Sequence, residues 1–79
     1  MPQNPIKQIR EEKEVTQHEL ALASDVSVST IRNIENGEVK EINENLLNFL
    51  EDKGYNREKL VKEYKTWLQE KKEEIEDKF

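Results

Sequence analysis

The chain has 79 residues, which is enough for one small domain and too few to enclose a bulky catalytic cavity. Charged residues make up 39%, yet 20 of the 79 residues are Ile, Leu, Val or Phe, so we expect a folded chain with a small aliphatic core. The formal net charge of −5 disfavours non-specific attachment to nucleic-acid phosphates, although it does not exclude a local docking surface.

Composition also excludes several kinds of site. There is no cysteine, hence no disulfide, thiolate metal site or thiol nucleophile. The single histidine, His18, cannot build a zinc site alone, and we predict that it faces solvent without a role. No nucleophile can be paired with a base, so we expect no enzymatic activity, no metal and no cofactor. No apolar run is long enough for a membrane span, and we expect a cytoplasmic protein with no membrane partner.

The spacing of apolar residues predicts helices throughout, because no segment alternates as a strand does. Asn4 is a good cap for a first helix over about residues 5–13. Thr16 and Glu19 have the spacing of a capping box, so they begin a second helix, which we expect to end near Ser24.

Three further helices follow in the pattern. Ser27 caps one that ends before Gly37, where glycine accepts a positive φ. Asn43 caps the next helix, which Gly54 stops, and a last helix follows over about residues 57–78. Its apolar residues lie on a single stripe: Leu60, Val61, Tyr64, Trp67, Leu68, Ile75 and Phe79.

Residues 17–36 hold two short helices joined by a turn of three to four residues, which is the spacing of a helix-turn-helix. The small side chain of Ala21 lets the two helices cross closely. Four apolar residues lock that crossing: Leu20, Val26, Ile31 and Ile34. The opposite face of the second helix must then project outward, with Val28 at its edge and a polar row of Ser29, Arg32, Asn33 and Asn36.

Such a face has the chemistry of base recognition in the DNA major groove. Asparagine makes paired hydrogen bonds to adenine, arginine does so to guanine, and valine contacts the methyl group of thymine.

The stretch resembles the phage-repressor (Xre-type) helix-turn-helix family over about residues 5–54. The residues that carry the resemblance are Ile6-Lys-Gln-Ile-Arg10, Thr16-Gln17, Glu19-Leu-Ala21, Val26, Thr30-Ile31 and Ile34-Glu-Asn-Gly37. The last run is far more specific than amphipathic spacing. The resemblance implies an all-α fold, a compact five-helix repressor-like domain with a long C-terminal helix, which binds duplex DNA as a dimer and controls transcription.

The resemblance also implies roles for individual residues. Gln17 matches a glutamine that bonds a DNA phosphate, and Asn36 and Lys40 match positions that contact the DNA backbone. The residues expected to read bases are Val28, Ser29, Arg32 and Asn33. Arg10 and Glu35 match an ion pair between the first and third helices, which we treat as structural because a lone buried charge is costly.

Four acidic positions depart from the family pattern. Glu14 and Asp25 stand where glycine is usual, and Glu38 and Glu41 stand where basic residues or proline are common. We expect Glu14 to reshape its loop, and carboxylates beside the expected DNA backbone repel phosphate.

We therefore predict a single domain over residues 1–79 that binds duplex DNA sequence-specifically through residues 17–36. It would act as a small transcriptional regulator, and we favour repression. The alternative, motivated by the acidic charge, is a protein-interaction module on the same fold: an anti-repressor, antitoxin or accessory factor with weak or no DNA binding.

The last helix adds a prediction about assembly. Its stripe extends past what one small core can cover, so either its far end folds back or Leu68, Ile75 and Phe79 meet a partner helix. A homodimer is the commonest solution, and another protein is the second option. Lys71 interrupts the stripe, and we expect it to be a solvated cation near the helix end.

Overall fold

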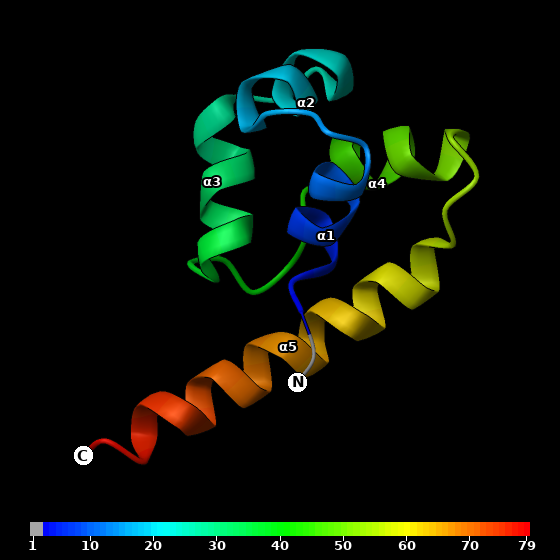
Figure 1. Cartoon of the computed structure of the whole chain (residues 1–79). Coiled ribbons are helices and arrows are strands. Elements are labelled where there is room, and N and C mark those ends of the chain that lie inside the picture. The colour runs from blue at the N-terminus through cyan, green and yellow to red at the C-terminus, as the bar shows by residue number, and fades with distance from the viewer. Residues whose placement is uncertain (1–2) are drawn as a thin grey trace.

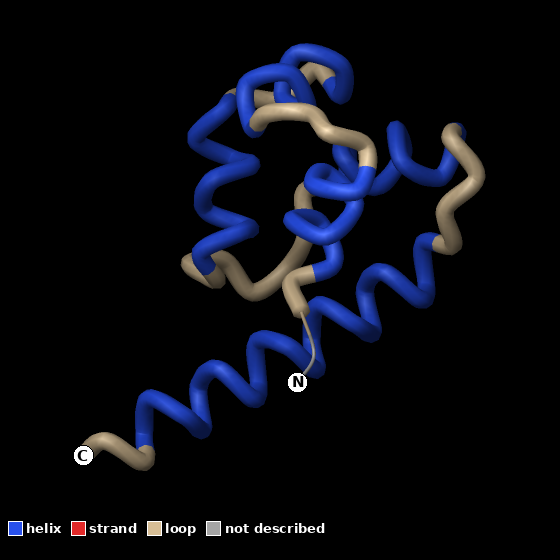
Figure 2. The backbone as a smooth tube through the Cα atoms, in the orientation of Figure 1, coloured by secondary structure: helices blue, strands red, loops and turns tan. Residues whose placement is uncertain are grey.

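The computed structural model describes residues 3–79, and every regular element in that range is a helix (Figures 1 and 2). The helices are α1 (Pro5–Glu12), α2 (Gln17–Ser24), α3 (Val28–Asn36), α4 (Glu44–Asp52) and α5 (Arg57–Glu76). This confirms the predicted all-α fold with five helices and a long last helix. α1 contacts α3 and α5, whereas α2 contacts α3 and α4. α5 runs along one side of the other helices, and its C-terminal end extends past them (Figure 1).

Each helix begins where the sequence predicts a cap. The side chains that accept amide hydrogen bonds there are Asn4, Thr16, Ser27, Asn43 and Asn56. Thr16 and Glu19 complete the capping box. α1 ends at Glu12, one residue earlier than predicted, and the chain then turns through Glu14 at φ 56°. Glu14 thus adopts the left-handed conformation that glycine usually supplies.

The core receives side chains from all five helices and from the segment before α4. Its fully buried members are Ile6, Leu20, Ala21, Ile31, Ile34, Ile42, Leu46, Leu47, Leu50, Leu60 and Tyr64. Tyr64 is the largest of the side chains that are fully buried, and its hydroxyl donates a 2.6 Å hydrogen bond to the carbonyl of Val39. Burial raises the pKa of the Tyr64 phenol, so the hydroxyl remains protonated and able to donate.

The far end of α5 does not fold back onto the core. Ile75 is 46% exposed and Phe79 is fully exposed. Trp67 and Leu68 are half-buried and pack against the core. Leu68, which we grouped with Ile75 and Phe79 as a candidate partner contact, is thus covered in part by the core itself. Within residues 3–79 no helix has both the length and the apolar character needed to cross a bilayer.

Gly37 lies where α3 meets α5. Its φ is 75°, as predicted, and a methyl group there would lie 3.0 Å from Cη2 of Trp67 and 3.2 Å from Cδ1 of Leu68. The glycine therefore serves two purposes, the turn after α3 and the close approach of α5.

Replacing Gly37 by alanine should destabilise the fold through both effects. Gly54 is the matched control, because its φ is 96° but no atom lies within 4 Å of an added methyl group. We expect Gly54→Ala to lower the free energy of unfolding by about 1 kcal/mol from backbone strain, and Gly37→Ala by about 1 kcal/mol more from the clash. Urea denaturation followed by circular dichroism measures both. Equal losses would mean that Trp67 moves aside at no cost.

Candidate nucleic-acid interface

The outward face of α3 is open to solvent. Ile31 and Ile34 point into the core, and the opposite side carries the predicted polar row. Ser29, Arg32 and Asn36 are exposed, and Val28 and Asn33 are half-buried. An α-helix with its side chains is about 10–12 Å across, and the DNA major groove is about 12 Å wide. The face is thus free, and a helix such as α3 fits the groove.

The start of α2 stands beside the start of α3. Together they border an open depression of about 630 Å³, lined by Arg10, Glu14, Val15, Thr16, Gln17, His18, Val28 and Arg32. The depression unites Gln17, an expected backbone contact, with two of the expected base-reading residues. His18, for which we predict no role, also lines it and is exposed. The sequence offered one signal that His18 lies at this surface, since it directly follows Gln17 in the first turn of α2.

An ion pair between α1 and α3 holds this region together. Arg10 Nε lies 2.8 Å from Glu35 Oε2, and Arg10 Nη2 lies 3.0 Å from Glu35 Oε1. Arg10 Nη1 also donates to the carbonyl of Val15, at 3.1 Å. The hydrogen bond to Glu35 raises the pKa of the Arg10 guanidinium, against the opposing effect of burial, so the guanidinium keeps its charge.

Gln17 is joined to the same carboxylate. Its side-chain amide donates to Glu35 Oε1 at 3.2 Å. A primary amide carries a second hydrogen, which is left for another acceptor. The ion pair therefore fixes the side chain of Gln17 at the rim of the depression before any ligand arrives, which lowers the entropy cost of using it.

Asn4 also ties α1 to the last turn of α3. Its side-chain amide donates to the carbonyl of Ile34 at 3.0 Å and to that of Glu35 at 3.5 Å, and its oxygen caps α1. The residue is buried, so these bonds are shielded from water. Orientation of α3 relative to α1 is thus set by polar contacts as well as by the apolar core.

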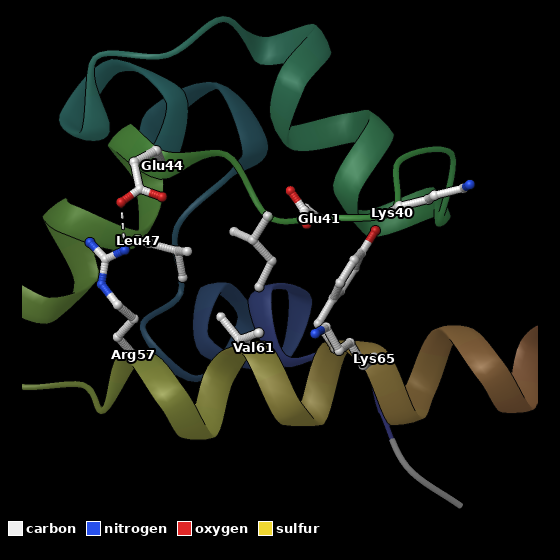
Figure 3. A pocket seen from close by; sticks show the side chains of 9 residues that line it. Lys40, Glu41, Glu44, Leu47, Arg57, Val61 and Lys65 are labelled. Atoms are coloured by element: carbon white, nitrogen blue, oxygen red, sulfur yellow. Dashed lines mark hydrogen bonds and ion pairs between the residues drawn. The ribbon is translucent and has the colours of Figure 1, made fainter.

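The remaining backbone candidates lie at the C-terminal end of α3. Asn36 is exposed there, whereas Lys40 lies four residues further on and does not border the depression. Lys40 lines a separate hollow of about 210 Å³ between the segment before α4 and α5, and its side chain extends away from that hollow (Figure 3). Glu44 and Arg57 close the other end of the hollow through a 2.6 Å ion pair.

Lys71 differs from its prediction. It is half-buried rather than fully solvated, since its ammonium group lies 5.1 Å from the centre of the Trp67 ring. The same group donates a 2.6 Å hydrogen bond to the carbonyl oxygen of Asn36. Contacts between residues 35 positions apart leave no local signal in the sequence.

Two other features could indicate a functional site: a cluster of metal-binding side chains or an unpaired buried polar group. Across residues 3–79, His, Asp and Glu side chains do not gather in groups of three that could hold a metal ion. Every buried side-chain nitrogen or oxygen in that range has a hydrogen-bond partner.

The fold and this surface define a helix-turn-helix protein of the DNA-binding class. The sequence profile of the helix-turn-helix family matches residues 6–60, from α1 into the first turn of α5. The chain therefore belongs to the Xre-type helix-turn-helix family of DNA-binding regulators, which confirms the resemblance seen in its motifs. Comparison with curated proteins and comparison with solved structures each found no match.

Removing one partner of the Arg10–Glu35 pair should be costly. Arg10→Met leaves a carboxylate that is 3% exposed without its cation, and we expect the free energy of unfolding to fall by about 3 kcal/mol. The double variant Arg10→Met/Glu35→Leu should recover most of that loss, because no unpaired charge remains. Denaturant titration of the single and double variants gives both values.

The exposed pair of Glu44 and Arg57 provides the control. Glu44→Gln should cost much less than Arg10→Met, since water already screens Glu44. If the two substitutions lower the free energy of unfolding equally, the Arg10–Glu35 pair contributes no more to stability than the exposed pair.

Proposed function

We propose that the chain binds duplex DNA sequence-specifically through residues 17–36 and acts as a small cytoplasmic transcriptional regulator, with repression as the favoured direction. The observation that carries this proposal is the exposed polar face of α3, held at a fixed angle while Ile31 and Ile34 are buried behind it. Family membership supplies the DNA-binding class, and the face supplies the means of choosing a sequence.

The two sets of residues have different tasks in this proposal. Val28, Ser29, Arg32 and Asn33 contact base edges in the major groove. Gln17, Asn36 and Lys40 contact phosphates on either side and fix the depth and register of α3. Gln17 also benefits from the N-terminus of α2, where free amide groups and the helix dipole favour an anion.

We further propose that the chain acts as a homodimer. Ile75 and Phe79 remain exposed at the far end of α5, and an exposed apolar stripe of this kind is best satisfied by a second copy. A two-fold dimer would present two α3 helices to half-sites one DNA turn apart, about 34 Å.

The second candidate is a protein-interaction module on the same fold. It is favoured by the acidic net charge and by Glu38 and Glu41, both exposed in the segment after α3. These carboxylates would attract a basic protein partner, whereas they would weaken DNA binding. The end of α5 offers such a partner an apolar contact.

Selection from a pool of duplexes with random central sequences separates the two candidates. The full chain should enrich one motif made of two inverted half-sites about 10 base pairs apart, and fluorescence anisotropy should show preference for that motif over a scrambled duplex. The contrary result is that no motif is enriched even at low salt, while one basic protein co-purifies stoichiometrically. That result would support the protein-interaction module and reject sequence-specific DNA binding.

Two substitutions should affect the selected duplex differently. Asn33→Ala should relax discrimination at one base pair by about 1–3 kcal/mol, because it removes contacts to a base edge. Gln17→Ala should weaken binding to the selected and the scrambled duplex by the same factor, because it removes a phosphate contact. Anisotropy with duplexes that vary at single positions measures both. Loss of base preference in Gln17→Ala but not in Asn33→Ala would contradict the assigned roles.

A further inference from the structure

The second half of α5 lies beside the C-terminal end of α3 and the segment that follows it (Figure 1). Lys71 Nζ donates to the carbonyl oxygen of Asn36 at 2.6 Å. Trp67 and Leu68 touch Gly37, and the Tyr64 hydroxyl donates to the carbonyl of Val39. The α5 residues that make these contacts lie beyond residues 6–60, which the family profile covers, so the family resemblance assigns them no role.

The contacts hold Lys71 in place. Its ammonium group sits 5.1 Å from the Trp67 ring centre, and that ring in turn lies 5.7 Å from the ring of Tyr64. Tyr64 is anchored in the core, with 1% of its surface exposed. A lysine on a free helix surface samples many rotamers, whereas this one is restrained by a cation–π contact and a hydrogen bond. Its charge therefore has a defined position relative to Asn36.

The charge is also placed where α3 needs it. The C-terminal end of a helix carries partial negative charge, and α3 has no basic residue in its last turn. Glu38 and Glu41, exposed just beyond, add two carboxylates. Lys71 therefore adds a positive charge next to Asn36, where Lys40 alone would otherwise face these two carboxylates.

A phosphate is expected at this place if the proposed function holds. Phosphates line both walls of the major groove. Residues that continue past the base-reading part of α3 therefore approach the backbone at one wall. Asn36, whose carbonyl Lys71 contacts, is already a proposed backbone contact.

We propose that Lys71 is itself a DNA-phosphate ligand, contributed by α5 to the interface built by α2 and α3. An ammonium group has three hydrogens, of which one is donated to Asn36, so others remain for a phosphate oxygen. Lys71 thereby places a positive charge at the end of α3 and partly offsets Glu38 and Glu41. This inference rests on the proposed DNA binding and adds a contact to it.

The salt dependence of DNA affinity tests this contact directly. Each lysine–phosphate contact adds about 0.9 to the slope of log Kobs against log salt concentration, because condensed counterions are released. Using the duplex that the wild-type chain enriches, we expect Lys71→Met to make the slope less steep by about 0.9. The ratio of wild-type to variant affinity should then shrink roughly threefold between about 50 and 200 mM NaCl. Lys71→Arg should restore the wild-type slope.

Lys72 is the matched control. No hydrogen bond or ion pair joins it to α3. Its side chain is 69% exposed, and its ammonium nitrogen lies 3.9 Å from a carboxylate oxygen of Glu76. Lys72→Met removes the same charge from the same helix and should leave the slope unchanged. Circular dichroism checks that each variant is folded. If Lys71→Met unfolds the chain, Lys71→Gln replaces it, since its amide retains a donor without the charge.

The outcomes are distinguishable. A Lys71 variant with weaker binding but the wild-type slope would overturn the proposal, because the lysine would then only support α3. An equal change of slope in Lys72→Met would also overturn it, as an effect of net charge. If the wild-type chain enriches no duplex, the proposed function itself fails and this contact fails with it, whereas an unchanged Lys71 slope leaves the proposed function standing.

Discussion

The carboxylate of Glu35 is the point on which the helix-turn-helix depends. It accepts hydrogen bonds from two nitrogens of Arg10 on α1 and from Gln17 on α2, while Glu35 itself belongs to α3. Three helices therefore meet at one side chain that is almost wholly shielded from water. Because an unpaired charge in such a place is costly, the angle between α2 and α3 has little freedom. That rigidity lets the outward face of α3 act as one unit.

A second constraint acts just beyond Glu35, where α3 ends. The long helix α5 contacts Gly37 through Trp67 and Leu68, and it supplies Lys71 to a carbonyl that α3 leaves free. An acidic chain can in this way present positive charge where a phosphate is expected, because local placement matters more than net charge within a Debye length of about 10 Å. The proposed interface thus draws on an element outside the matched family region.

Most of the fold could be predicted from local sequence rules. Thr16 and Glu19 signal their capping box within four residues, and Gly37 signals the end of α3 through its conformational freedom. Contacts between distant residues were not predictable in this way. The bond from Lys71 to Asn36 spans 35 positions, so no local pattern signals it. The Arg10–Glu35 pair could be anticipated only because the family resemblance supplied it.

The central claim is that the outward side of α3 meets DNA. Titration of ¹⁵N-labelled protein with the enriched duplex, followed by amide chemical shifts, tests it residue by residue. The account predicts that the largest shifts fall in residues 28–36 and at Gln17, with smaller ones around residue 71 and none in α4. Shifts confined to the exposed end of α5, with α3 unaffected, would contradict it.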